Sequence, residues 1–360
     1  MKVAILSMQQ VKNYGSFLQA YSLKHNIESL GHTCDFVNIV PGEQLGEYKI
    51  GKFHKIRLLC QRLVGIDFIK RFKTIKKFQT RFSKEFLPEL GVQSGANTAH
   101  YDVVVIGSDE VFNCAQKTWF GFSRQLFGDG LNADKVITYA ASFGATTEEK
   151  LEQLGIKGVV AELLKKINKI SIRDANSLET VKNLTGIIPE KHLDPVFIYN
   201  YDHLLPPSVP LKDYMIVYTY PGRITDKSEI SAIKAFAKGK GLKLISIGHY
   251  FPWCDDVVVP HPFEVLAYFK NASYVVTDTF HGSVFSIKYN KQFATIIRGM
   301  NSNKLSYLLQ QFNLESRIIR NVENLSSILE VPIDYDSINA DVTMETNRSI
   351  HYLKSNIKTE

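Results

Sequence analysis

Residues 273–283 read Ser-Tyr-Val-Val-Thr-Asp-Thr-Phe-His-Gly-Ser, and this stretch decides the fold that the chain is expected to adopt. Tyr274 to Val276 have the apolar character of a buried parallel strand near its end. The residues from Ser283 to Tyr289 then follow helical spacing, so Asp278 and His281 fall on the turn between strand and helix. In open α/β sheets, ligands bind at such turns. The stretch therefore predicts both a parallel sheet and a site at its edge.

The same turn predicts an anion-binding site. The backbone N–H groups of Gly282, Ser283 and the next residue are expected to point outward at a helix N-terminus, where the helix dipole favours negative charge. The hydroxyl groups of Thr279 and Ser283 would complete the cradle. His281 can exchange protons near neutral pH, and we expect Asp278 to set its tautomer. The alternative is that His281 only caps the helix or packs, and a single histidine leaves both interpretations open.

Strands and helices alternate along the whole chain. In its first part, strands are expected at 3–6, 34–40, 101–109, 136–141 and 169–172, and helices at 17–30 and 148–166. In its second part, strands are expected at 214–218, 242–247, 274–277 and 293–297, and helices at 227–238, 262–271, 283–290 and 342–357. This alternation predicts an α/β protein of two Rossmann-like domains, with parallel sheets that face a central cleft.

A group of prolines predicts the boundary between the two domains. Pro195, Pro206, Pro207 and Pro210 crowd one short stretch, and proline neither continues a helix nor donates within a sheet. We therefore expect a linker there. The predicted domains are residues 1–200, residues 201–335, and a helical tail at 336–360.

The composition is that of a soluble globular protein. Of the 360 residues, 44% are hydrophobic and 22% are charged. No apolar run approaches the roughly 18 residues of a membrane span. Met1 to Ser7 contain only a brief apolar run, which predicts a first strand and not a signal peptide. We expect the protein to stay in the cytoplasm.

Neither a metal nor a cofactor is expected. The cysteines, Cys34, Cys60, Cys114 and Cys254, form no C-x-x-C pair, which argues against a structural zinc or a disulfide framework. No G-x-G-x-x-G follows the first strand and no P-loop occurs, so a dinucleotide oxidoreductase and a P-loop kinase are not supported. The adjacent acids Asp255 and Asp256 are interpreted as solvated loop residues.

A basic helical insertion at about 49–86 contributes most of the formal net charge of +7. Apolar residues recur there at helical spacing in two groups, which are Phe53, Ile56, Leu59, Leu63 and Ile66, and then Ile69, Phe72, Ile75, Phe78, Phe82 and Phe86. Two basic amphipathic helices are predicted. The simpler interpretation is a packed helix with a solvated cationic face, and the alternative is peripheral contact with the inner face of an anionic membrane. Nucleic acid is not expected as a partner, because no binding motif accompanies the charge.

Short motifs in a fixed order resemble the polysaccharide pyruvyl transferase family over roughly residues 1–320. They are Asn-Tyr-Gly-Ser-Phe-Leu-Gln-Ala-Tyr from residue 13, Val-Ile-Gly-Ser-Asp-Glu-Val-Phe-Asn from 105, Tyr-Ala-Ala-Ser-Phe-Gly from 139, Ser-Ile-Arg-Asp from 171, Leu-Asp-Pro-Val from 193 and Thr-Asp-Thr-Phe-His-Gly-Ser-Val-Phe-Ser-Ile from 277. The resemblance implies a GT-B-like fold and metal-independent transfer of pyruvate from phosphoenolpyruvate to a saccharide as a ketal. We expect the acceptor to be a saccharide precursor of a surface polysaccharide, and this precursor could be linked to a lipid. Thr279 departs from the family pattern, because other members have arginine in the corresponding Arg-Leu-His-Gly-like arrangement.

The donor side is assigned to one arginine and to the turn around His281. Arg173 lies at a strand end, where a guanidinium can grip a carboxylate or phosphate with two hydrogen bonds. A salt bridge with Asp174 or another acid is the alternative, and the family motif favours the donor role. His281, Arg173 and Asp109 are the predicted catalytic residues. The predicted donor-binding residues are Arg173, Asp278, Thr279, Gly282 and Ser283.

The acceptor side is assigned to the first and third strand ends. Asp109 could accept a proton from a sugar hydroxyl, or it could cap the segment that follows. The predicted acceptor-binding residues are Asn13, Tyr14, Gly15 and Ser108, with Gly15 allowing close backbone approach and Tyr14 offering a flat face to a sugar. Asp194 is expected to be structural, at the hinge.

Two other functions remain open at this point. The same cleft could hold a nucleotide diphosphate, which would make the protein a GT-B glycosyltransferase that uses a sugar nucleotide. The second alternative is a catalytically silent glycan-binding protein, which is suggested by Thr279 at the position of the family's arginine.

Overall fold

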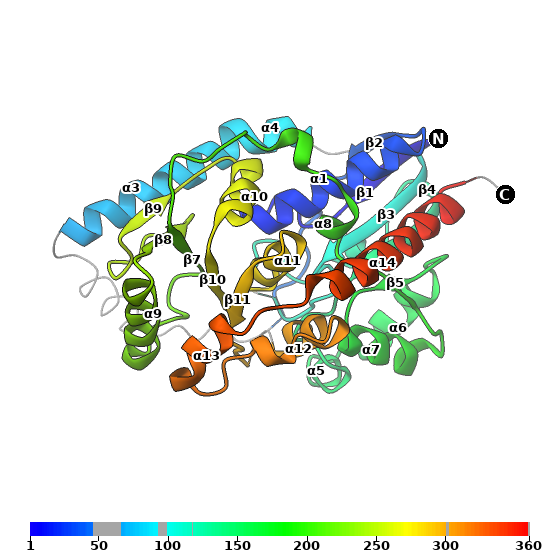
Figure 1. Cartoon of the computed structure of the whole chain (residues 1–360). Coiled ribbons are helices and arrows are strands. Elements are labelled where there is room, and N and C mark those ends of the chain that lie inside the picture. Colours follow the sequence, from blue (N-terminus) through cyan, green and yellow to red (C-terminus); the bar gives the residue numbers. More distant parts are fainter. Residues whose placement is uncertain (46–65, 93–98, 117, 300–301, 359–360) are drawn as a thin grey trace.

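The computed structural model describes residues 1–45, 66–92, 99–116, 118–299 and 302–358. Two parallel sheets lie in separate halves of the molecule, and helices cover them (Figure 1). The predicted two-sheet α/β architecture is confirmed. Buried strands alternate along the chain with helices that each bury one face. Such a chain is most stable when its strands form a sheet between layers of helices.

The first sheet has strand order β2-β1-β3-β4-β5-β6, and every neighbouring pair is parallel. Its strands are β1 Lys2–Leu6, β2 Thr33–Phe36, β3 Tyr101–Asp109, β4 Ala133–Ala141, β5 Ser171–Ile172 and β6 Glu190–Lys191. The helices of this part of the chain are α1 Tyr14–Ser29, α5 Glu148–Gln153, α6 Lys157–Lys165, α7 Ala175–Thr185 and the short α8 Pro195–Ile198.

The second sheet has strand order β11-β10-β7-β8-β9, again with parallel neighbours. Its strands are β7 Tyr214–Tyr218, β8 Lys243–Ile247, β9 Asp256–Val258, β10 Tyr274–Thr277 and β11 Gln292–Thr295. The helices that follow these strands or end the chain are α9 Lys227–Gly239, α10 Pro262–Asn271, α11 Phe280–Lys288, α12 Ser302–Gln311, α13 Leu325–Glu330 and α14 Tyr335–Asn356.

Several predicted boundaries differ from the structure. The single helix predicted at 148–166 is two helices, because the chain breaks at Gly155, which has a φ of 68°. The helix predicted to begin at Ser283 is α11, and it begins at Phe280 because the Thr279 side chain accepts a hydrogen bond from the backbone N–H of Gly282. The short strands β6 and β9 and the helices α12 and α13 were not predicted, and their apolar patterns are brief.

The last helix returns from the second half to the first (Figure 1). In α14 the Tyr352 hydroxyl donates to the Thr138 carbonyl at 2.9 Å, and its ring lies 4.4 Å from the ring of His192. The chain passes from the first sheet to the second between Lys191 and Tyr214. The predicted domain boundary near residue 200 lies in this segment and stays a prediction.

An aromatic core joins the two halves. Phe17 and Tyr21 of α1 contact Phe263 of α10, with ring centroids 6.0 and 4.8 Å apart. All three rings belong to one buried cluster that extends through both halves. The two halves are therefore fixed against each other by apolar packing, which holds the strand ends of both sheets around a common site.

The second of the two predicted basic helices is present as α3 Ile66–Arg81, and the first lies outside the described residues. A π-helical turn at Phe82–Phe86 and the short α4 Leu87–Leu90 continue α3. Phe78, Phe82 and Phe86 pack on Tyr14 of α1. Among the described residues, none of the helices combines the length and apolar character needed to cross a bilayer.

Candidate functional site

A pocket lies between the two halves, at the carboxyl ends of β3, β7 and β10. Its volume is about 200 Å³. The lining residues come from both halves and are Met8, Val11, Asn13, Asp109, Glu110, Gln116, Thr118, Tyr220, Arg223, Thr279, Phe280, His281 and Lys304. The site thus lies where the strand-end motifs of the two sheets meet, and His281, Asp109, Thr279 and Asn13 are the predicted site residues that line it.

His281 occupies the first turn of α11, and its side chain is 10% exposed. Its Nε2 atom lies 3.7 Å from Asp194 Oδ2, which is buried. The ring of His281 also contributes to the lining of the pocket. The residue that orients the imidazole is therefore Asp194, which we expected to be structural at the hinge, and the prediction that gave this part to Asp278 is wrong.

The backbone of Gly15 packs closely against the imidazole of His281. A Cβ atom at position 15 would lie 2.1 Å from Nδ1 of His281 and 2.2 Å from Cγ, closer than atoms can approach. Gly15 therefore allows the close backbone approach that we predicted, but the group that approaches is His281 and not an acceptor sugar.

Arg173 is buried beneath the pocket, with only 2% of its side chain exposed. Its Nη1 donates to Asp194 Oδ2 at 2.6 Å, its Nη2 donates to Asp109 Oδ1 at 3.3 Å, and its guanidinium lies 4.4 Å from the centre of the Phe280 ring. Arg173 does not line the pocket, so the prediction that it grips the donor is corrected. The ion-pair alternative describes it better, although its partners are Asp109 and Asp194 and not Asp174.

Asp109 is a fixed carboxylate at the pocket wall. Its Oδ2 accepts from the Ser16 hydroxyl at 2.8 Å. Burial alone would raise the pKa of Asp109, but the charges of Arg173, His281 and Lys304 lower it to about 2. A carboxylate with so low a pKa is a weak base near neutral pH. Its predicted role as proton acceptor is thus less favoured than charge stabilisation and positioning.

The anion cradle differs from the predicted one. The Gly282 N–H donates to Thr279 Oγ1 at 2.9 Å, and the Ser283 N–H donates to the Thr279 carbonyl at 3.3 Å. Both amides are thus used within the chain, and Ser283 is fully buried. Within the described residues, no hydrogen bond engages the backbone N–H groups of Phe280 and His281, which also line the pocket. The free N–H donors at the start of the helix therefore begin two residues earlier than predicted, at Phe280 and not at Gly282.

Asp278 belongs to the second half's own polar cluster. Burial raises the pKa of Asp278, while a hydrogen bond with Thr219 and the charges of Arg223 and Arg298 lower it. Its side chain does not line the pocket. Asp278 thus interacts with Arg223 and Arg298 without lining the pocket. The prediction that it contacts the donor is corrected.

Two cations that the sequence reasoning missed line the pocket, Arg223 and Lys304. Arg223 Nη1 donates to the Asp278 carbonyl at 3.4 Å, and its guanidinium lies 4.7 Å from the centre of the Tyr220 ring. Lys304 of α12 forms an ion pair with Glu110, which follows β3 in the other half. A signal existed for Arg223, because it lies in the loop after the predicted strand at 214–218. Lys304 comes from an unpredicted helix and had no such signal.

Two predicted acceptor residues are interior residues. Tyr14 is 2% exposed, its hydroxyl donates to the Pro260 carbonyl at 3.0 Å, and its ring packs on phenylalanines. Ser108 is buried, and its hydroxyl donates to Gln19 Oε1 at 2.6 Å. Neither can offer a surface to a sugar, because Tyr14 is covered by packing across the two halves and Ser108 by residues of its own half. Asn13 caps α1 by accepting from the Ser16 N–H and remains at the pocket.

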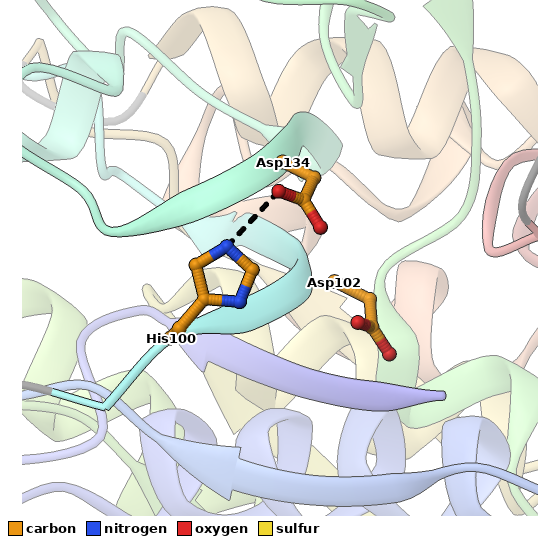
Figure 2. A group of neighbouring side chains, drawn as sticks. All are labelled: His100, Asp102 and Asp134. Carbon is orange, nitrogen blue, oxygen red and sulfur yellow. Dashed lines mark hydrogen bonds and ion pairs between the residues drawn. The ribbon is translucent and has the colours of Figure 1, made fainter.

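A separate acidic cluster lies at the amino ends of β3 and β4, the opposite edge of the sheet (Figure 2). It consists of His100, Asp102 and Asp134, whose ligand atoms lie within 4.8 Å of one another. His100 Nε2 contacts Asp134 Oδ1 at 2.9 Å, and Asp102 Oδ2 accepts from the Lys2 N–H at 2.7 Å. The contact between His100 and Asp134 and the backbone hydrogen bond to Asp102 account for the cluster.

Comparison with known families gives one match. The model of the family described as polysaccharide pyruvyl transferase matches residues 13–299, which is most of the chain. The match includes the strand-end motifs of both halves. No curated protein sequence matches the chain significantly.

Solved structures share the fold at low sequence identity. A protein described as a UDP-N-acetylglucosamine 2-epimerase from Listeria monocytogenes is 9% identical, with a TM-score of 0.54 over 98% of this chain and 96% of that one. The MnaA protein of S. aureus, solved with UDP, is 11% identical, with a TM-score of 0.50 over 100% of this chain and 98% of that one. These relatives confirm the predicted GT-B-like fold. At such identity they show the fold alone.

Proposed function

The chain belongs to the polysaccharide pyruvyl transferase family, and from that premise we propose that it transfers pyruvate from phosphoenolpyruvate to a saccharide as a cyclic ketal. The observation that carries the proposal is the pocket between the two halves. It places His281 of the family motif beside two cations and two unbonded backbone N–H groups.

The size and charge of the pocket suit a small anion. Phosphoenolpyruvate carries up to three negative charges, which Arg223, Lys304 and the N–H groups of Phe280 and His281 can neutralise. A volume of about 200 Å³ is below the several hundred Å³ typical of sites for larger ligands. We propose that Arg223 replaces the arginine that other members carry where this chain has Thr279.

The reaction needs one proton donor and one proton acceptor. A proton adds to the methylene carbon of the donor, which leaves an electron-deficient C2 atom. One sugar hydroxyl adds to C2 and loses its proton, the C2–O bond to phosphate breaks, and a neighbouring hydroxyl closes the ring and loses its proton. We propose that the imidazole of His281 carries protons in this sequence, with Asp194 holding the ring. Cationic side chains supply the charge stabilisation, so we propose that no metal ion is required.

Family membership also supports a proposal for the acceptor and for the place where the protein works. We propose that the acceptor is a saccharide precursor of a surface polysaccharide, carried on a lipid, and that the protein works in the cytoplasm. Asn13 and the carboxylates Asp109 and Glu110 form the pocket wall on the side of the first sheet, and we assign them to the acceptor.

The proposal is tested by incubating the protein with phosphoenolpyruvate and oligosaccharide acceptors in the presence of a chelator. We expect release of inorganic phosphate together with an acceptor whose mass increases by one ketal-linked pyruvate. Thermal unfolding with phosphoenolpyruvate and, separately, with UDP-sugars compares the donors, because a bound donor raises the unfolding temperature. Stabilisation by a UDP-sugar alone, with sugar transfer to the acceptor, would establish a glycosyltransferase instead.

Arg223→Ala is expected to raise the KM for phosphoenolpyruvate by about tenfold or more, because it removes a charge-assisted contact to the donor. Arg223→Lys should restore only part of the affinity, since lysine lacks the planar fork of donors. Arg298→Ala is the matched control, because Arg298 is paired with Glu229 and does not line the pocket. An unchanged KM in Arg223→Ala would remove the donor assignment.

A further inference from the structure

Within the part of the chain that the structure describes, the outward face of α3 is apolar and exposed. Phe68, Ile69, Phe72 and Ile75 are 38%, 54%, 58% and 37% exposed. Their spacing of one, three and four residues places them on one side of the helix. The opposite side carries Thr74 and Phe78, which are buried. A helix that already buries one apolar face therefore presents a second apolar face to its surroundings.

The same helix is strongly cationic. Between Phe68 and Lys84 the sequence contains seven cations and no acidic residue, and the lysines among them are exposed. They are Lys70, Arg71, Lys73, Lys76, Lys77, Arg81 and Lys84. Of the two nearest acids, Asp67 accepts from the Tyr250 hydroxyl at 2.6 Å, and Glu85 pairs at 2.8 Å with Arg81, which is one of the seven cations.

The helix is held firmly on the body of the protein. Phe78 lies 5.2 Å from Tyr14 and 5.8 Å from His249, measured between ring centroids, so α3 contacts both halves. Arg81 Nη1 also donates to the Val259 carbonyl at 2.7 Å. The outward face is therefore a fixed surface that needs no unfolding to meet a partner.

We propose that the outward face of α3 docks on an anionic lipid surface. Apolar side chains flanked by lysines suit the boundary between acyl chains and anionic head groups, where the apolar groups leave water and the cations meet phosphate. A second copy of this face is a poor partner, because the lysines of the two copies would repel each other. This surface is remote in sequence from the pocket residues, and the proposal is independent of the proposed function.

The experiment is cosedimentation of the full chain with phosphatidylcholine vesicles that contain about one third phosphatidylglycerol. We expect binding at low salt, weak binding to pure phosphatidylcholine, and loss of binding as salt rises and screens the charges. Ile69→Gln/Phe72→Gln should lower the partition coefficient by about tenfold or more. Lys70→Gln/Lys73→Gln/Lys76→Gln/Lys77→Gln should lower it by about a hundredfold or more.

Matched variants separate this face from general hydrophobicity and charge. Ile188 and Met344 are 76% and 60% exposed on other elements, so Ile188→Gln/Met344→Gln removes as much apolar surface and should leave binding unchanged. Lys227→Gln/Lys234→Gln/Lys238→Gln/Lys243→Gln removes four exposed lysines from α9 and β8 and is the corresponding charge control, and circular dichroism checks the fold of every variant. Equal binding by the α3 variants and the wild-type chain would overturn the proposal. So would a wild-type dimer in light scattering that Ile69→Gln/Phe72→Gln abolishes.

Discussion

His281→Ala will lower the turnover of pyruvate transfer by about a hundredfold or more, while the KM for phosphoenolpyruvate changes little. The reason is geometric. Asp194 lies 3.7 Å from Nε2 and the backbone of Gly15 packs against the ring near Nδ1, so the imidazole is held between them at the pocket wall. A proton carrier held in this way acts in the transition state, and its loss therefore appears in kcat. Phosphate release at saturating donor and acceptor measures the effect.

Two variants separate this role from packing. His281→Gln keeps most of the volume of the ring and some hydrogen-bonding capacity, but it cannot carry a proton, so its turnover should be as low as that of His281→Ala. His261→Ala removes a histidine that is paired with Glu89 outside the pocket, and its turnover should match the wild-type value. Turnover of His281→Gln within about threefold of wild type would show that the ring only binds or packs.

The fold could be predicted because its signals are local. Strand and helix periods, strand-end polar residues and the prolines after residue 194 are each visible within a few neighbouring residues. Helix boundaries were less accurate where a side chain decides them. The Thr279 hydroxyl caps α11 and moves its start ahead of Ser283, and no periodic pattern contains that information.

The location of the site could be predicted from the sequence, but the roles of its residues could be predicted only in part. His281 and Asp109 lie at the pocket because strand ends of parallel sheets meet at one edge. The burial of Arg173 depends on Asp194, which is 21 residues away, and on Phe280, which comes from the other half. Tyr14 is buried by Phe78 of α3 and by Phe82 just after it, again from far along the chain. Contacts of this range are set by packing between elements, and a single sequence does not display them.

Asp194→Asn will lower the free energy of unfolding by about 3 to 5 kcal/mol at neutral pH, the range found when one partner of a buried ion pair is removed. The Asp194 carboxylate is 1% exposed and accepts from Arg173 at 2.6 Å. Asparagine keeps the shape but removes the charge, so Arg173 retains only Asp109, at 3.3 Å, as a close counter-ion. Denaturant unfolding at neutral pH measures the loss. Asp129→Asn, which breaks an exposed pair with Arg124, should cost less than about 1 kcal/mol.

The pH dependence of the difference identifies its cause. Burial would raise the pKa of Asp194, but His281 and Arg173 lower it below its ordinary value, as Arg173 also does for Asp109, whose pKa is about 2. A carboxylate with a lowered pKa stabilises the fold above its unfolded pKa of about 4, and that stabilisation is lost as pH falls through the folded value. The wild-type chain should therefore lose its advantage over Asp194→Asn progressively in the pH window below about 4, because protonation removes the same negative charge that the substitution removes. A stability difference that stays constant over this window would mean that the amide disturbs packing, and that the charge of Asp194 contributes little to holding Arg173 and His281 in place.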